Sequence, residues 1–342
     1  MRIGILTGGG DCPGLNAVLR AVVKKGLQCD IEVLGILNGW KGLLDGEAEP
    51  LSEVRVSGII DRGGTLIGTS RTNPMKNPNG LQLCRQTWER FGLQGLIAVG
   101  GDDTLSVAAK FHEAGLPVVG VPKTIDNDIA STDFTFGFDT AVSIATEAID
   151  RLHTTAESHQ RIMVCEVMGR HAGWIATFAG LASGADCIII PEFPMRMAKV
   201  AEIINERRKK GKSFSLVVIA EGAKPEFAAD VIKQSMKLDE FGHVRLGGVG
   251  HLVAEEIERL TGIETRVTIL GHVQRGGTPT AFDRILATRF GLAAIGLVLE
   301  RQWGMMVALR GNEIVPVPLK EATATKKLVP REWFALAEVF FG

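Results

Sequence analysis

The segment LIAVGGDDT (residues 96–104) joins a short aliphatic run to a glycine turn and then to the helical pattern of residues 105–114. The order repeats one unit later, where the run VVGV (residues 118–121) leads into PKTIDND (residues 122–128). Buried strands that alternate with amphipathic helices are typical of parallel sheets with helices on both faces. These two segments therefore predict an α/β fold.

The same alternation continues along the chain. Strands are expected at residues 3–6, 31–37, 96–99, 118–121, 162–167, 188–190, 216–220 and 267–270. Helical periodicity marks residues 17–27, 105–114, 141–152, 200–210 and 252–260. A second group of strands begins near Ile162, so we expect a change of domain near residue 138. Residues 225–250 are weakly periodic and predict a connection with one short helix, residues 228–237.

Composition narrows the class of protein. The chain has 342 residues, 45% of them apolar, which is enough for a substantial core. Its 38 basic and 39 acidic residues leave a formal charge of -1, which gives no reason to expect nucleic acid or an anionic membrane as a partner. The five cysteines lack metal or disulfide spacing, and no apolar run approaches about 18 residues. We therefore expect a cytoplasmic protein.

Two glycine-rich turns follow predicted strands. The first, GGGDCPG (residues 8–14), lets the backbone approach a ligand, and amides at a helix start receive phosphate oxygens. It lacks the P-loop spacing, and packing alone also explains such a turn. In the second turn, Asp102 and Asp103 begin a helix, where one acid would serve as a cap. Two acids beside paired glycines indicate a hard cation such as Mg²⁺.

The segment TIDND (residues 124–128) adds groups for proton transfer. Asp126 and Asp128 are two positions apart, so both face one side of an extended loop, although an Asx-rich turn is the alternative. One carboxylate could take a proton from a hydroxyl while the other supports it. With phosphate-binding turns and metal-binding acids nearby, this predicts phosphoryl transfer, which depends on alignment, charge neutralisation and a base.

The second half of the chain carries basic residues beside predicted strand ends. They occur in SHQR (158–161), VMGR (167–170), ETR (264–266) and LGHVQRGG (270–277), with Glu221-Gly222 after another strand. Guanidinium groups match the oxygens of a phosphate ester, and His272 could join them. A single arginine is more often a surface ion-pair partner, but their joint placement predicts a phosphate clamp.

In this order, these motifs resemble the 6-phosphofructokinase family, from Ile3 to at least Arg284. The resemblance implies two doubly wound, largely parallel-sheet α/β domains. Residues 1–137 with about 274–322 would bind the phosphoryl donor and Mg²⁺, and residues 138–273 with about 323–342 would bind fructose 6-phosphate.

The resemblance also implies a role for each matching residue. Asp126 would be the catalytic base and Asp102 the magnesium ligand, while Thr124, Arg170 and Lys123 would act on the transferring group. Donor contacts would come from Gly10, Arg71, Asp103 and Lys123. Fructose 6-phosphate would be bound by Thr124, Asp126, Asp128, Arg161, Met168, Gly169, Arg170, Glu221, Arg266, His272 and Arg275. Arg161 and Arg266 match arginines that complete a neighbouring subunit's site, which implies a homodimer or homotetramer.

At two positions expected to contact the phosphoryl donor, the chain departs from the common ATP-using bacterial pattern. That pattern has glycine at the positions of Asp103 and Lys123, and this pair is similar to the pyrophosphate-dependent branch. A carboxylate about 4 Å from a phosphate charge costs roughly 4 kcal/mol at an effective dielectric constant of about 20. ATP has an α-phosphate to be repelled and pyrophosphate has none. We therefore expect reversible transfer from pyrophosphate to the sugar 1-hydroxyl, with an ATP-dependent 6-phosphofructokinase as the alternative.

Two other classes fit less well. A sugar-phosphate sensor that has lost its chemistry would not need both Asp102 and Asp126. A dinucleotide-dependent oxidoreductase would need the spacing Gly-x-Gly-x-x-Gly, which residues 8–14 lack.

Overall fold

A computed structural model describes residues 1–225 and 248–342. They form two compact units, each with its own sheet. Unit 1 comprises Met1–Thr140 and Arg275–Lys326, and unit 2 comprises Ala141–Gln274 and Lys327–Gly342. The helix expected at residues 228–237 lies outside the described residues. Both units are α/β with largely parallel sheets, so the predicted fold class is confirmed.

The sheet of unit 1 has seven strands among the described residues, in the order β11-β10-β5-β4-β1-β2-β3. Their bounds are β1 Arg2–Gly8, β2 Glu32–Ile36, β3 Ala48–Pro50, β4 Leu96–Gly100, β5 Val118–Pro122, β10 Met305–Arg310 and β11 Glu313–Pro318. The pairs from β10 through β5, β4 and β1 to β2 are parallel, while β3 and β11 pair antiparallel at the two edges. The apolar run of β4 is buried along its whole length, as expected for a central strand.

The register of the central strands brings their ends to one level. Gly8 at the end of β1 pairs with Gly100 at the end of β4, and Gly100 pairs in turn with Pro122 at the end of β5. The segments that follow these strands therefore start side by side. In open α/β sheets, ligands bind at this carboxyl edge.

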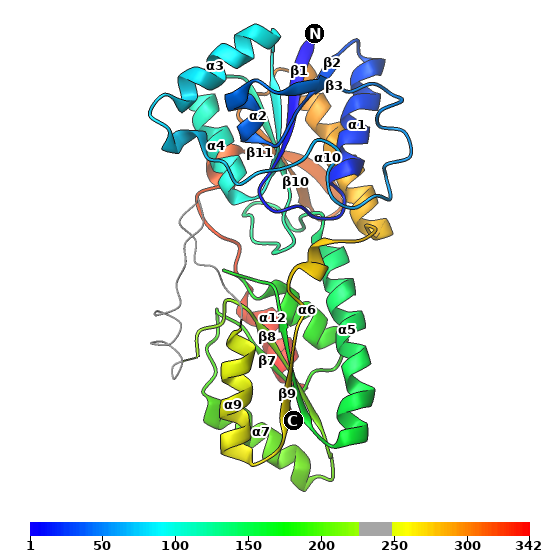
Figure 1. Cartoon of the computed structure of the whole chain (residues 1–342), viewed down its shortest axis with the longest axis vertical. Helices are drawn as coiled ribbons and strands as arrows, with labels where there is room; N and C mark the ends of the chain where they lie inside the picture. The colour runs from blue at the N-terminus through cyan, green and yellow to red at the C-terminus, as the bar shows by residue number, and fades with distance from the viewer. Residues whose placement is uncertain (226–247) are drawn as a thin grey trace. The chain divides into compact units, whose positions relative to one another are not determined.

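Helices cover both faces of this sheet (Figure 1). α1 (Leu15–Gln28) and α10 (Ala281–Leu299) lie on one side, where Gly291 allows α10 to approach the backbone of Val18. α3 (Gly80–Phe91) and α4 (Asp102–Glu113) lie on the other side. The remaining short elements of unit 1 are α2 (Trp40–Asp45), η1 (Pro74–Lys76) and α11 (Leu319–Ala322). On the second face the rings of Trp40 and Phe111 pack 4.7 Å apart between centroids.

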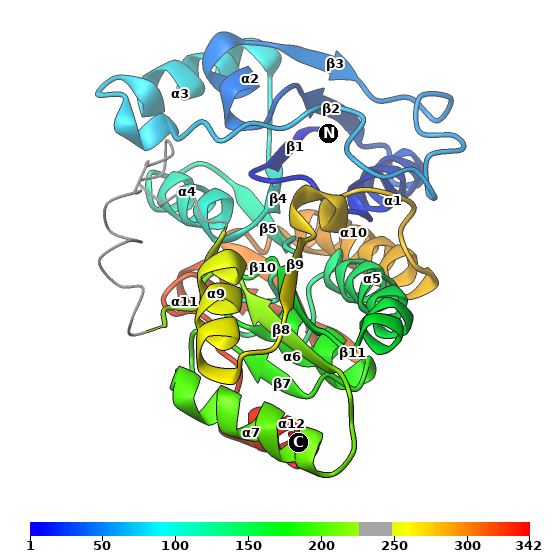
Figure 2. The same cartoon turned by 60° about the horizontal axis from the view of Figure 1, so that its bottom comes forward.

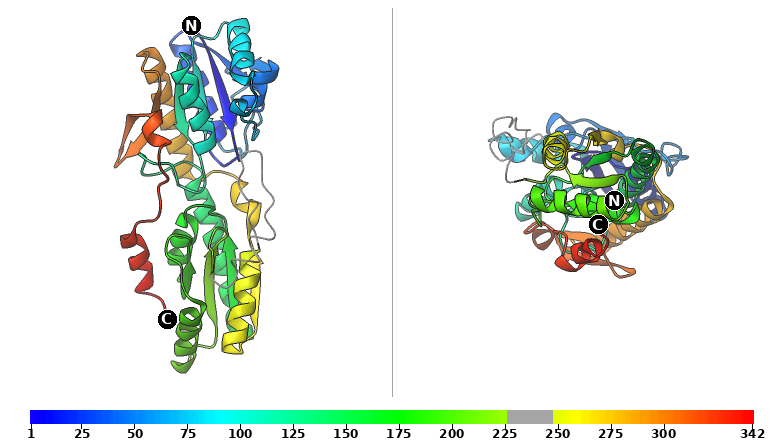
Figure 3. Two further views of the ribbon diagram at one scale, coloured as in Figure 1. Left: turned by 90° about the vertical axis from the view of Figure 1, so that its left-hand side faces the viewer. Right: turned by 90° about the horizontal axis from the view of Figure 1, so that it is seen from below.

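Unit 2 contains a parallel sheet in the order β7-β8-β6-β9 among the described residues. The strands are β6 Ile162–Val167, β7 Cys187–Ile189, β8 Ser215–Ala220 and β9 Thr265–Ile269. Helices α7 (Met197–Lys209) and α9 (Val249–Thr261) lie next to one another against one face (Figure 2). α12 (Arg331–Glu338) packs with α6 (Trp174–Ala182) on the opposite side from α9 (Figure 3). The short helix η3 (Gly271–Arg275) follows β9.

None of the helices in the described residues combines the length and apolar character that a membrane crossing requires.

A buried acid connects two segments of unit 1 that are distant in sequence, near the points where the chain leaves this unit and re-enters it. α5 (Phe138–His159) begins in unit 1, and there Asp283 of α10 accepts hydrogen bonds from Thr140 N (2.8 Å) and Thr140 Oγ1 (2.5 Å). Thr280 caps α10 and donates to Asp139 (2.6 Å). Burial raises the pKa of Asp283 to about 6, although the bonds from Thr140 act in the opposite direction.

We predict that this carboxyl makes stability depend on pH. Because its folded-state pKa is raised from 3.8 to about 6, its protonated form favours the folded state below pH 3.8, and this contribution is lost as pH rises through about 6. The loss amounts to up to about 3 kcal/mol. Asp283→Asn should remove that pH dependence from the unfolding free energy measured by denaturant titration. Equal pH profiles for the two proteins would contradict the assignment, and Asp139→Asn serves as the neighbouring control.

Candidate active site

The first glycine turn is held in place by a second loop. Gly9 donates its amide to Ser70 O (3.0 Å), and Thr69 Oγ1 donates to Gly9 O (2.7 Å). Gly68 has φ 70, and a Cβ there would lie 2.4 Å from Asn38 Oδ1, so only glycine fits this close turn. These bonds bring Arg71, the next residue after Ser70, to the turn at Gly9 and Gly10.

The second glycine turn places two acids at a helix start. A Cβ on Gly8 or on Gly100 would lie 2.5 or 2.3 Å from the buried side chain of Thr104. Glycine at both strand ends therefore allows α4 to begin directly against the sheet. Asp102 and Asp103 occupy its first turn, where the helix dipole stabilises carboxylates.

Lys123 is buried among these turns. The residue is 3% exposed, its backbone amide donates to Gly100 O (2.9 Å), and its Nζ donates to Gly10 O. Burial lowers the pKa of Lys123, and the Arg275 guanidinium adds to the effect, while Asp11 and Asp126 oppose it. A lysine amine at this glycine turn attracts a phosphate group when it is protonated.

The segment carrying Asp126 and Asp128 is shaped by a left-handed residue between them. Asn127 has φ 50 and is 1% exposed. Its Oδ1 accepts from Thr135 N (3.1 Å), and its Nδ2 donates to Asp133 O (3.4 Å). Thr135 Oγ1 also donates to Thr124 O (2.7 Å), so both ends of the turn are fixed to the returning chain. Asparagine tolerates this conformation better than most residues.

A lysine that the sequence motifs did not indicate bridges two of the predicted site acids. Lys326 Nζ lies 2.9 Å from Asp102 Oδ2 and 3.2 Å from Asp128 Oδ2. Its backbone forms an antiparallel bridge with Ile129, which brings the C-terminal return of unit 1 to this loop. Burial works against the charged amine, but Asp128 and Asp102 outweigh it, and the pKa of Lys326 is raised.

These acids suit a hard cation. Within the described residues, no group of three or more His, Cys, Asp and Glu side chains is arranged to hold a metal ion. Mg²⁺ is usually bound by one or two carboxylates and completes its octahedron with water and phosphate oxygens. Asp102 and Asp128 offer oxygen ligands of this type, and the ammonium of Lys326 between them shows that the position accommodates positive charge. The residues therefore fit Mg²⁺.

In unit 2, the segments after β6 and β8 lie against each other. Glu221 N donates to Val167 O (2.8 Å), and Gly222 N donates to Gly169 O (3.1 Å). A Cβ on Gly222 would lie 2.0 Å from Arg170 O, so this close contact requires glycine. Met168, which is buried, donates its amide to Gln274 Oε1 of η3 (3.3 Å). Met168, Gly169, Arg170 and Glu221 are thus gathered beside η3, which carries His272.

The two arginines that were assigned to a neighbouring subunit share one partner. Arg161 Nε lies 2.6 Å from Glu264 Oε2, and Arg266 forms an ion pair with the other carboxylate oxygen. Pairing of β6 with β9 sets this arrangement. Arg275, by contrast, belongs to unit 1, and a Cβ on Gly10 would collide with its guanidinium. Arg275, which was expected to bind fructose 6-phosphate, thus lies beside the donor turn at Gly10.

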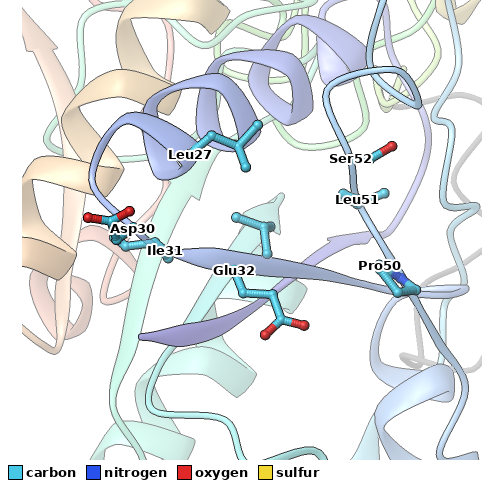
Figure 4. A pocket seen from close by; sticks show the side chains of 8 residues that line it. Leu27, Asp30, Ile31, Glu32, Pro50, Leu51 and Ser52 are labelled. Atoms are coloured by element: carbon cyan, nitrogen blue, oxygen red, sulfur yellow. The ribbon is translucent and has the colours of Figure 1, made fainter.

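The cavity in Figure 4 is separate from these loops. It is lined by the end of α1, the start of β2 and the segment after β3, including Asp30, Glu32 and Ser52. β2 is parallel to β1, so its start lies at the edge of the sheet opposite to Gly8 and Gly100. This cavity has no part in the candidate active site.

Comparison with known proteins decides the family. The family model described as "Phosphofructokinase" matches residues 2–298. The chain belongs to the phosphofructokinase family. It is 58% identical, over the whole length of both chains, to a pyrophosphate--fructose 6-phosphate 1-phosphotransferase of Amycolatopsis methanolica.

Other phosphofructokinases are also similar. An ATP-dependent 6-phosphofructokinase 2 of Streptomyces coelicolor is 52% identical over the whole of both chains. The solved phosphofructokinase of Saccharomyces cerevisiae superposes with a TM-score of 0.83 at 33% identity, covering 99% of this chain and 46% of the yeast chain. Both donor types are therefore found among proteins similar to this phosphofructokinase family member.

We predict that Asn127→Ala destabilises the protein by about 2–4 kcal/mol, because it leaves the buried amide of Thr135 without its acceptor, removes the bond to Asp133 O and strains a left-handed position. Asn127→Gly, which accepts the same φ, should lose less. Chemical unfolding of both variants measures the difference. Equal losses of unfolding free energy in the two variants would show that the left-handed backbone at residue 127 adds no strain to the alanine variant.

Proposed function

We propose that this phosphofructokinase transfers a phosphoryl group reversibly from pyrophosphate to the 1-hydroxyl of fructose 6-phosphate. The products are fructose 1,6-bisphosphate and phosphate. The observation that carries the choice of donor is the pair Asp102-Asp103 in the first turn of α4, beside the buried Lys123. The names of similar proteins that use pyrophosphate support the same choice.

Asp103 is the residue that would discriminate between donors. It follows the proposed metal ligand directly and lies in the first turn of α4. A fixed negative charge repels the α-phosphate of ATP, while pyrophosphate has only two phosphates and ends before that position. Lys123 offsets the concentrated charge of the smaller donor. Specificity of this kind combines attraction of one ligand with repulsion of its competitor.

In the forward direction, Asp126 takes the proton of the sugar 1-hydroxyl as that oxygen attacks the terminal phosphorus of pyrophosphate. The bond from this phosphorus to the bridging oxygen breaks, and phosphate leaves with the bonding electrons. Thr124 fixes the backbone of Asp126, whose amide donates to Thr124 Oγ1 (3.1 Å). Arg71 and Arg170 neutralise the charge of the transferring group. Positioning and charge stabilisation supply most of the catalysis in such transfers.

Asp102 would hold Mg²⁺, which supplies charge neutralisation on the phosphate oxygens when bound. The backbone amide of Gly10 would receive a further oxygen of the donor, since the Gly9 amide already donates to Ser70 O.

On the acceptor side, we assign the 6-phosphate to Arg161, Arg266, His272 and Arg275. Glu264 holds the first two in a fixed pair at the protein surface, with side-chain exposures of 30% for Arg161 and 59% for Arg266. Exposed, aligned guanidinium groups could reach a phosphate that a second subunit binds. We therefore propose a homodimer or homotetramer in the cytoplasm.

The alternative donor is ATP, which a 52% identical relative is named for. Steady-state kinetics of the purified protein with fructose 6-phosphate, Mg²⁺ and either donor decides between them. Turnover with pyrophosphate and little with ATP is expected, and efficient turnover with ATP alone would reject the proposal.

We predict that Asp103→Gly raises kcat/KM for ATP by on the order of 10- to 1,000-fold, because the repelling charge is removed. Asp103→Asn, which keeps the size and removes the charge, should recover part of this gain. Donor kinetics of both variants provide the measurement. An unchanged preference in both would show that residue 103 does not select the donor.

We predict that Asp126→Ser lowers kcat by about 10²–10⁴-fold with either donor, because the proton acceptor is lost. Binding of fructose 6-phosphate and pyrophosphate, measured by calorimetry, should change little. A variant that retains most of its turnover would exclude Asp126 as the base.

We predict complementation between two inactive proteins. One is Asp126→Ser with intact arginines, and the other carries Arg161→Ala and Arg266→Ala with an intact base. If arginines serve a neighbour's site, subunits mixed by denaturation and refolding should regain part of the wild-type activity, and separately refolded controls should not. Absence of any gain in mixed oligomers would place the arginines in their own subunit's site.

A further inference from the structure

Lys326 is a charged, largely enclosed residue for which the proposed mechanism has no role. Its ammonium lies within 3.2 Å of one oxygen of each of two carboxylates, and its side chain is 30% exposed. The bridge between Lys326 and Ile129 fixes its backbone beside Asp128. It is therefore built into the site and is not a mobile surface lysine.

The two acids that it joins have different surroundings. The Asp128 side chain is 7% exposed and the Asp102 side chain 28%. A buried carboxylate needs a partner, because an unpaired buried charge is costly. Lys326 supplies that partner to Asp128 and at the same time occupies Asp102 Oδ2, one of the two oxygens that this carboxylate could offer to a metal ion.

We propose that Lys326 acts as an internal cation that competes with the divalent metal ion for Asp102. The inference rests on the proposed function, in which Asp102 is the metal ligand. With Lys326 in place, the free protein binds divalent cations weakly, since the ammonium repels them and blocks one ligand oxygen. The metal ion then binds well only together with the charge of pyrophosphate, which outweighs the repulsion.

Titration with Mn²⁺, followed by electron paramagnetic resonance in the absence of any phosphate, tests this competition in the full-length protein. Lys326→Met should bind Mn²⁺ at least tenfold more tightly than the wild type. Lys326→Arg keeps the charge and should bind close to the wild type. Unchanged or weaker Mn²⁺ binding by Lys326→Met would overturn the proposal.

A second pair of variants keeps the test valid if the buried Asp128 destabilises Lys326→Met. Asp128→Asn removes that charge, so Asp128→Asn and Asp128→Asn/Lys326→Met can be compared directly. The double variant should again bind Mn²⁺ more tightly, by tenfold or more. Equal affinities in this pair would also overturn the proposal.

A third comparison shows whether the tighter Mn²⁺ binding depends on Asp102. Adding Asp102→Asn to Lys326→Met should abolish the tighter Mn²⁺ binding, and its persistence would mean that the ion binds elsewhere and that Lys326 does not compete for Asp102. Turnover of the wild type with pyrophosphate is measured separately. Its absence would reject the proposed function, whereas the ratio of Mn²⁺ affinities would still report on the competition.

Discussion

The parallel pairing of β1, β4 and β5 is the constraint on which the candidate site depends. Because Gly8, Gly100 and Pro122 are in register, three segments distant in sequence leave the sheet at one level. Glycine at two of these ends lets Thr104 pack against them, so α4 starts at the sheet edge with its acids. Backbone amides, a buried lysine and carboxylates are thereby concentrated at one edge of the sheet.

Charge balance then determines what this edge can bind. Arg71, Lys123 and Lys326 supply positive charge, while the aspartates at residues 102, 103, 126 and 128 supply negative charge. A ligand must match this mixed pattern, with dense negative charge near Lys123 and a cation near the aspartates. A small diphosphate with a divalent ion has that pattern. A triphosphate that extends further must in addition tolerate Asp103.

The core strands other than β10 could be predicted from sequence because they are short, aliphatic and buried on both faces, as in β4 and β6. The buried strand β10 was not predicted. The edge strands β3 and β11 were missed because they are polar or contain proline, and pairing with a neighbour alone makes them strands. α10 was missed for a different reason. It packs on α1 yet leaves apolar Ile285 and Leu292 exposed, so it lacks an amphipathic pattern. The motif residues of the site could be predicted from sequence because they directly follow predicted strands. Lys326 gave no such signal, since Asp128 is 198 positions away.

A crystal structure of the Asp126→Ser variant, grown with Mg²⁺, fructose 6-phosphate and both donors, would show directly which donor the site selects. We expect pyrophosphate on the turn at Gly9 and Gly10, with the metal ion on Asp102 and the Asp103 carboxylate in the space beyond the second phosphate. ATP bound in that place, with the Asp103 side chain turned away from it, would show that Asp103 does not exclude ATP.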